Sequence, residues 1–294
     1  MPGRLSLYDQ VAEQAADVVV RRYSTSFGWA TRLLAARCRV EIRNVYALVR
    51  LADEVVDGAA AEAGDLASAR ALLDALEAET DRAIASGYST NVLVHAFAGT
   101  ARRAGIDATL TAPFFASMRE DLVPRVHDAD SLRRYIYGSA EVVGLMCLRV
   151  FLLDEPAEVR GERYEDLRPG AQALGAAFQK INFLRDLADD TDRLGRAYLV
   201  GVDPQHFTEQ QKSEILADIQ ADLTLADAAL RRLPPACRRA VALAFGLFAE
   251  LTRRLTATPA QEISRTRVRV PGLVKARVAA RTLAPRGRPA TVPS

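Results

Sequence analysis

The stretch NFLRDLADD, residues 182–190, places oxygen-bearing side chains at helical spacing inside an otherwise apolar segment. Asn182, Asp186 and Asp190 are each four residues apart, and Gln179 precedes them by three. At 3.6 residues per turn, these four side chains project within roughly 80° of one another on a helix. The remaining faces carry Leu, Ile, Phe and Ala, so the sequence predicts a buried helix with one narrow polar stripe.

A second stretch, NVYALVRLADEVVD at residues 44–57, repeats this arrangement. Tyr46, Arg50, Asp53 and Asp57 fall within roughly 60° of one another on a helix. Val, Leu and Ala surround them. Two aspartate pairs with i, i+4 spacing are therefore expected on two helices that are fit for burial.

The paired aspartates indicate either a solvated helix face or a cation site. A solvated face usually mixes long Lys and Glu side chains in i, i+4 pairs, whereas these stripes use short Asp and Asn together with Arg, Gln and Tyr. Two carboxylates at i and i+4 also repel, by about 0.2–0.5 kcal/mol, unless a cation lies between them. Mg²⁺ is usually held by one or two carboxylates together with substrate phosphates, and Arg50, Arg185 and Arg196 supply positive charge nearby. We therefore expect a magnesium site, which manganese can also occupy, that binds a diphosphate.

The elements that position these stripes are all expected to be helices. Helical periodicity recurs along the sequence, and alternating strand patterns bounded by hairpin turns are missing from it. The expected helices span residues 7–22, 26–34, 41–57, 65–85, 90–104, 108–123, 131–153, 170–190, 208–233, 235–257 and 274–283. Since no repeat or linker divides them, they predict one all-α domain over residues 1–264, followed by a basic tail over residues 265–294.

Charge and cysteine content disfavour several classes of protein. A formal net charge of +2 over 294 residues argues against general nucleic-acid binding. The three cysteines lie far apart without metal-ligand spacing, and no Gly-rich strand–turn–helix segment predicts a nicotinamide cofactor. The N-terminus has no apolar signal region, and the longest apolar run is too short to span a bilayer. We expect a cytoplasmic protein.

The tail is the most unevenly charged part of the sequence. No Asp or Glu follows Glu262, whereas eight Lys or Arg residues lie between positions 265 and 288. Two interpretations are open: a solvated, disordered tail, or a segment that docks peripherally on an anionic surface such as the inner face of the plasma membrane.

Four segments resemble, in order, the motifs of the head-to-head isoprenyl diphosphate synthases, the squalene and phytoene synthases. They are YSTSF at 23–27, RLADEVVD at 50–57, YIYGSAEVVGLM at 135–146 and LGAAFQKINFLRDLADDTDRLGRAYL at 174–199. The resemblance covers about residues 20–260 and looks closest to bacterial phytoene synthases. It departs at Val200, where the family usually has proline, a change that loosens the loop backbone rather than removing a catalytic group.

The resemblance implies a single-domain, isoprenoid-synthase-type helical bundle with a central active-site cavity. The implied metal ligands are Asp53, Asp57, Asn182, Asp186 and Asp190. The implied catalytic residues are Asp53, Asp57, Asp186, Asp190, Arg50 and Tyr46. The implied substrate-binding residues are Ser24, Ser26, Arg50, Tyr135, Gln179, Asn182, Arg185, Arg196 and Tyr198.

The reaction that the resemblance implies is Mg²⁺-dependent condensation of two geranylgeranyl diphosphates, through a cyclopropylcarbinyl diphosphate, to the carotenoid precursor phytoene. Squalene and dehydrosqualene synthases share the motifs but use farnesyl diphosphate, and terpene cyclases have similar aspartate helices. A catalytically silent relative is a further alternative, although such a protein need not keep all four aspartates.

Structural roles are also open for single residues. Tyr135 can be a core residue with a satisfied hydroxyl, and Ser26 can cap a helix. The small residues between Gly138 and Gly144 can leave room for a prenyl chain, or they can serve close helix packing.

Overall fold

The computed structural model describes residues 3–58, 66–123, 126–194 and 198–283, without the side chains of 25–27, 66–67, 189–194 and 283. Within these ranges all the regular elements are helices, as expected. In chain order they are α1 (Arg4–Tyr23), α2 (Thr25–Thr31), α3 (Ala36–Val56), α5 (Leu66–Ser86), α6 (Val92–Ala104), α7 (Ala108–Glu120), α8 (Ala129–Ile136), η1 (Tyr137–Glu141), α9 (Val142–Phe151), α10 (Ala157–Leu194), η2 (Pro204–His206), α11 (Glu209–Leu230), α12 (Pro235–Ala257), α13 (Ala260–Ile263) and α14 (Gly272–Leu283).

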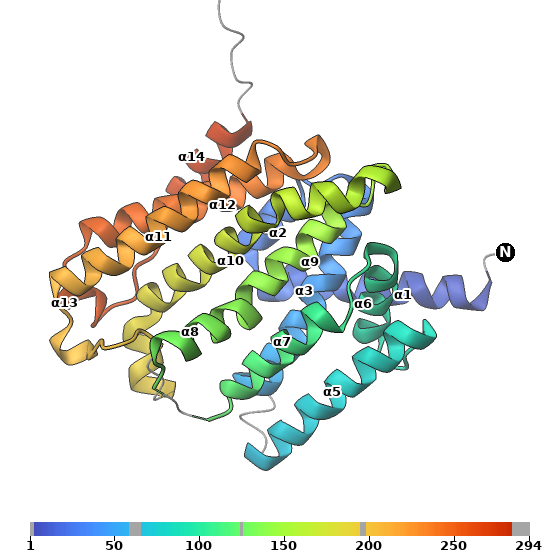
Figure 1. The fold of residues 1–294 in the computed structure, drawn as a ribbon, viewed down its shortest axis with the longest axis horizontal. Helices are drawn as coiled ribbons and strands as arrows, with labels where there is room; N and C mark the ends of the chain where they lie inside the picture. The colour runs from blue at the N-terminus through green and yellow to red at the C-terminus, as the bar shows by residue number, and fades with distance from the viewer. Residues whose placement is uncertain (1–2, 59–65, 124–125, 195–197, 284–294) are drawn as a thin grey trace, which may run out of the picture.

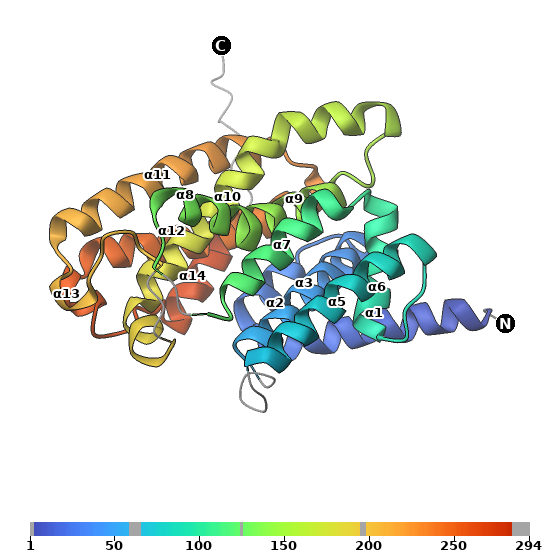
Figure 2. The same cartoon turned by 60° about the horizontal axis from the view of Figure 1, so that its bottom comes forward.

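The long helices lie side by side. Figure 1 shows a row of α5, α7, α9, α10 and α11, in which each helix contacts the next. Behind this row α3 packs against α9, α7 and α6, while α12 packs against both α10 and α11. In the turned view of Figure 2, α11 and α12 lie on one side of the molecule and α1, α3 and α6 on the other, with α9 and α10 between them.

Two large hydrophobic cores hold most of this arrangement together, and a smaller cluster around Ala30, Leu243 and Leu247 joins α2 and α14 to α12. The first fills the space among α3, α5, α6, α7 and α9 around Phe97, Phe114 and Leu148. The second joins α10 to α11, α12 and α13 around Ile181 and Leu255. Because α10 is packed on both sides, its C-terminal half is held firmly enough to carry a site.

Local sequence explains several helix ends. Asn91 accepts hydrogen bonds from the backbone N–H groups of the first turn of α6, and Gly105 ends that helix with a left-handed φ of 68°. Capping boxes begin α8 at Asp128 and α11 at Thr208. In each, the capping side chain accepts a hydrogen bond from the backbone N–H of the third helical residue, whose side chain accepts one from the backbone N–H of the capping residue.

Helix α10 begins at Ala157, well before the expected start at residue 170. Pro169 immediately precedes that expected start, and proline removes a backbone donor from a helix. Tyr164 and Leu167 are nevertheless buried in the first core. Tertiary packing of this turn therefore outweighs the local cost of Pro169.

The expected helix 131–153 is three elements, because a π-helical turn, η1, separates α8 from α9. The turn lies where the backbones approach most closely: a Cβ atom on Gly138 would meet the Pro113 carbonyl oxygen at 2.2 Å. A Cβ atom on Gly144 would meet the Ala171 carbonyl oxygen at 2.6 Å. Close helix packing therefore accounts for Gly138, whereas Gly144 both packs closely and lines a cavity together with Ser139 and Ala140.

Gly138→Ala should lower the free energy of unfolding by about 2–3 kcal/mol, because the added methyl group overlaps a neighbouring backbone. The matched control is Gly161→Ala in α10, where nothing lies within 4 Å of the added Cβ. That control should be neutral or stabilise by up to about 1 kcal/mol. Urea unfolding of both variants measures the difference, and equal midpoints would show that the crossing at Gly138 is not tight.

Candidate active site

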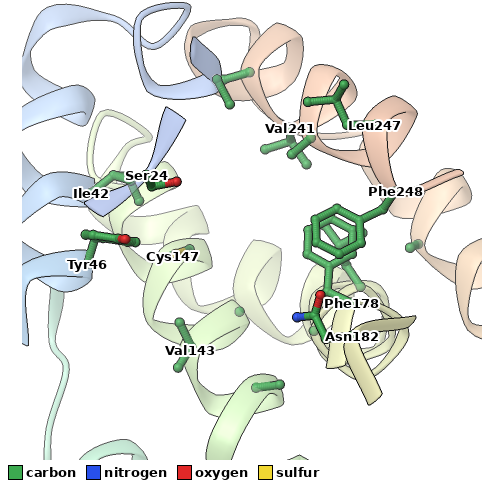
Figure 3. A pocket seen from close by; sticks show the side chains of 18 of the residues that line it. Ser24, Ile42, Tyr46, Val143, Cys147, Phe178, Asn182, Val241, Leu247 and Phe248 are labelled. Atoms are coloured by element: carbon green, nitrogen blue, oxygen red, sulfur yellow. The ribbon is translucent and has the colours of Figure 1, made fainter. Parts of the chain in front are cut away.

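A cavity of about 1000 Å³ opens between the two cores. Its walls come from α2, α3, η1, α9, α10, α11, α12 and the segment that follows α13. Figure 3 shows Tyr46, Ile42 and Cys147 on one wall, facing Phe178 and Phe248 on the other.

The two ends of the cavity differ in chemistry. Along α10 its lining runs from Leu167 to Arg185, about 27 Å at 1.5 Å per residue. The α10 residues from Leu167 to Phe178 that line it are Gly or apolar, whereas Asn182 and Arg185 are polar. The same order occurs on α3, where Ile42 lies toward one end and Asp53 toward the other. Such a cavity fits a molecule with a long apolar chain and a charged head.

Asp53 carries negative charge into the polar end. Its side chain lines the cavity and is 39% exposed. Burial raises the pKa of Asp53 to about 7, against the attraction of Arg50, and the charges of Asp57, Asp121 and Glu54 raise it further. Arg50 therefore does not fully compensate the negative charge of ionised Asp53, and a bound cation would stabilise this ionised form.

Arg50, Tyr46 and Ser24 surround this carboxylate. Arg50 lies 4.0 Å from Asp53, forms an ion pair with Glu54, and lies 4.3 Å from the ring centroid of Tyr23. The hydroxyl groups of Ser24 and Tyr46 are hydrogen-bonded to each other. The two hydroxyls and the guanidinium group place hydrogen-bond donors beside the acid.

The stripe on α10 contributes the opposite wall. Asn182 lines the cavity, and its Oδ1 atom is buried without a hydrogen-bond partner. Asp186 accepts a hydrogen bond of 2.7 Å from Nε of Arg185, and Nε of Arg267 lies 2.8 Å from the same carboxylate oxygen. The acid is thus held between two guanidinium groups.

Arg267 belongs to the segment for which the sequence indicated a free basic tail. Instead, residues 267–270 and Lys275 line the cavity. Helix α14 matches the expected helix 274–283 and packs against α12. Part of the unevenly charged tail is therefore turned inward, where it places three cationic side chains at the cavity.

The structure brings some of the expected site residues together at the cavity. The expected residues that line it are Ser24, Tyr46, Arg50, Asp53, Asn182 and Arg185. The expected residues outside this lining are Asp57, Tyr135, Gln179, Asp186 and Tyr198. The predictions for Ser26, Asp190 and Arg196 concern side chains outside the described part of the chain.

The residues outside the lining have identifiable surroundings. Asp57 ends α3 and acts on Asp53 through its charge. Tyr135 is 2% exposed, and its hydroxyl donates to Asp121, as does that of Tyr198. Tyr135 is thus a core residue with a satisfied hydroxyl, one of the two roles that the sequence left open.

The polar end fits a divalent cation of the magnesium type. Its donors are carboxylate and amide oxygens, which Mg²⁺ prefers, and the unpartnered Oδ1 of Asn182 is a ready ligand. No three Asp, Glu, His or Cys side chains converge on one point within the described ranges. Mg²⁺ in proteins commonly completes its coordination with waters and substrate phosphates.

The apparent affinity for Mn²⁺, a spectroscopic substitute for Mg²⁺, should fall by up to about tenfold for each pH unit below 7, because a proton competes for Asp53. Electron paramagnetic resonance titrations between pH 5.5 and 8 would measure this. Asp53→Asn should flatten the profile. A wild-type affinity that stays constant over this range would contradict the assignment.

Comparison with known proteins gives a consistent answer. The sequence profile described as squalene/phytoene synthase matches residues 20–274. Phytoene synthase from Mycobacterium tuberculosis is 28% identical over 293 residues, covering 93% of this chain and 91% of that protein. Chloroplastic phytoene synthase 1 from Arabidopsis thaliana is 32% identical over 201 residues, which are 68% of this chain but only 45% of the plant protein.

Solved structures show the same fold. A dehydrosqualene synthase in complex with a ligand superposes with a TM-score of 0.74 at 20% identity, covering 93% of this chain and 96% of the other. The squalene synthase HpnC from Alicyclobacillus acidocaldarius gives 0.71 at 22% identity, with 86% and 97% covered. In the part of the chain that the structure describes, no helix combines the length and apolar character needed to cross a membrane.

Proposed function

Because the chain belongs to the squalene/phytoene synthase family, whose members transfer prenyl groups, we propose that it condenses two geranylgeranyl diphosphates head to head to phytoene. The observation that supports this best is the cavity itself, with Asp53, Asn182 and Arg185 at one end of a long apolar wall. The similar proteins reported above are phytoene synthases, and this resemblance is the reason for proposing the C20 donor instead of the C15 donor.

The polar end would bind the diphosphate groups. Mg²⁺ held by Asp53, Asn182 and Asp186, with Asp57 and Asp190, would supply Lewis-acid stabilisation of the leaving diphosphate. Arg50 and Arg185 would offer forked hydrogen bonds to phosphate oxygens. Arg267 is already drawn to the site by Asp186. Because its side chain is already ordered there, it can exchange this carboxylate for phosphate oxygens with little further loss of conformational entropy.

The apolar wall would protect the prenyl cation that forms when diphosphate leaves. Phe178 and Phe248 stack at 3.7 Å between ring centroids, next to Asn182 (Figure 3). Aromatic faces stabilise positive charge, and the apolar lining excludes water that would quench it. The double bond of the second donor then attacks C1 of the first, and a cyclopropyl ring forms with loss of a proton.

Incubating the purified chain with Mg²⁺ and either geranylgeranyl or farnesyl diphosphate, followed by mass spectrometry of extracted lipids, tests this function. We expect a C40 hydrocarbon from the C20 donor and none without Mg²⁺. A C30 hydrocarbon formed faster from farnesyl diphosphate would replace the proposal by dehydrosqualene synthesis, or by squalene synthesis where its formation needs added NADPH as hydride donor. The absence of product from both donors would indicate a silent relative.

A further inference from the structure

A buried carboxylate outside the cavity lining, Asp121, is linked to both aspartate-bearing helices. It caps the C-terminus of α7 and is 9% exposed. Its two oxygens accept hydrogen bonds from different tyrosines, at 2.7 Å from the Tyr135 hydroxyl and 2.8 Å from the Tyr198 hydroxyl. A buried carboxylate is costly unless it is hydrogen-bonded, so this pair of donors is what allows Asp121 to lie there.

Tyr135 and Tyr198 also connect Asp121 to helix α10. Phe183 of α10 stacks on Tyr198 with ring centroids 4.4 Å apart and an angle of 11°, and lies 6.0 Å from Tyr135. His127 lies against both tyrosine rings, at 5.3 Å and 6.0 Å. The chain between Phe183 and Tyr198 includes Asp186 and Asp190. Asp186, three residues beyond Phe183 on α10, is therefore tied to Asp121 through the two tyrosines.

Asp121 also acts on the first acidic helix. It ends α7, which packs against α3, the helix that carries Asp53. Consistent with this packing, the negative charge of Asp121 raises the pKa of Asp53. Burial and the charge of Asp121 raise the pKa of Tyr135 well above its ordinary value, which keeps that phenol protonated as a donor. Both oxygens of Asp121 thus accept a tyrosine hydroxyl, and the carboxylate holds these two protein groups.

We propose that Asp121 is a positioning residue that, through the hydroxyls of Tyr135 and Tyr198, sets the spacing between the α10 stripe and Asp53 for divalent-cation binding. The proposal rests on the proposed metal-dependent function. In this proposal Tyr135 and Tyr198, the tyrosines of the third and fourth motif segments, act by holding Asp121 and do not contact the substrate.

The test is Mn²⁺ titration of the full chain, followed by electron paramagnetic resonance, for wild type, Asp121→Asn and Tyr198→Phe. Both variants should bind Mn²⁺ about tenfold more weakly, in the range seen when groups that orient metal ligands are removed. The double variant should be no weaker than the weaker single variant, since both changes open the same link. Tyr164→Phe, a buried tyrosine of α10 whose ring contacts Arg149, should leave the affinity unchanged.

Each other outcome overturns a defined part of the proposal. Wild-type affinity in both variants, with or without a lower melting temperature, would reduce Asp121 to a structural residue and leave the proposed function standing. Weaker binding in Asp121→Asn alone would make Asp121 a ligand. Failure of the wild type to bind Mn²⁺ would remove the metal-dependent function and this inference together. Tyr198→Phe deletes one hydroxyl, so it keeps the test valid if Asp121→Asn does not fold.

Discussion

Asp53→Asn should lower kcat/KM with a prenyl diphosphate by on the order of 10³-fold, because Lewis-acid stabilisation of a leaving group is worth several kcal/mol. Asparagine keeps the size of the side chain but is a weaker ligand for Mg²⁺. The same change should make the metal-free protein more stable at alkaline pH. An activity loss that accompanies a gain in stability cannot be explained by misfolding.

The stability gain follows from the raised pKa of Asp53, about 7 in the folded protein. The folded state binds this proton more tightly than the unfolded chain, so the stability from this group is present at acid pH and is lost as pH rises through about 7. The asparagine side chain that replaces it has no charge to desolvate. The melting temperature of Asp53→Asn, relative to wild type, should therefore increase between pH 5 and pH 8 in metal-free buffer.

Asp154→Asn is the matched control, since this carboxylate is 54% exposed, pairs with an exposed Arg37 and does not line the cavity. It should change neither activity nor the pH dependence of melting. Near-normal turnover by Asp53→Asn would contradict the proposed role of this residue in metal binding. A variant that is inactive and also melts lower at pH 8 would point to damage to the fold instead.

Much of the fold was predictable because periodicity reports which side of a helix is buried. The α3 and α10 stripes were found in this way, and Asp53, Arg50, Asn182 and Arg185 do line one cavity. The start of α10 was not predictable, because Pro169 is a strong local signal whose cost is outweighed by contacts with residues far away in sequence. The π turn at Gly138 is likewise set by a partner helix.

The part of the site that sequence reasoning missed comes from long-range contacts. Asp121 has no acidic partner at helical spacing, and nothing local indicates that two tyrosines converge on it. Arg267 did give a signal, as part of a run without acids, but that signal equally fits a solvated or membrane-bound tail. The ion pair with Asp186 and the place of Arg267 in the cavity lining show where this side chain lies.

The apolar end of the cavity can be located from how the helices run. Gly170 of α10 lies against Ala229 of α11, and Lys180 pairs with Asp222, so the two helices are antiparallel. The backbone of Ala35, just before α3, bonds to Ala236 at the start of α12. The starts of α3 and α12 and the end of α11 thus share the apolar end. The lining residues gathered there are Leu34, Phe151, Leu167, Leu233 and Ala240.

Ala240→Phe should therefore shorten the cavity and lower kcat/KM for geranylgeranyl diphosphate by about 100-fold or more, because a clash with several methylene groups costs a few kcal/mol. Farnesyl diphosphate, shorter by one isoprene unit, should be affected much less. Ala242→Phe, on the same helix but outside the cavity lining, is the control and should leave the preference unchanged. Competition assays with both donors measure the ratio directly.

The opposite change gives an independent check on the same geometry. Phe151→Ala removes a ring from the apolar end and should extend the range of donors toward C25 while retaining C20. Both effects depend on donors lying with the diphosphate at Asp53 and the chain tip near Ala240. If Ala240→Phe slowed both donors equally and its melting temperature matched that of Ala242→Phe, the prenyl chain would have to follow another path through the cavity. In that case the residues around Phe178 and Phe248, not those around Phe151, would be the ones to vary.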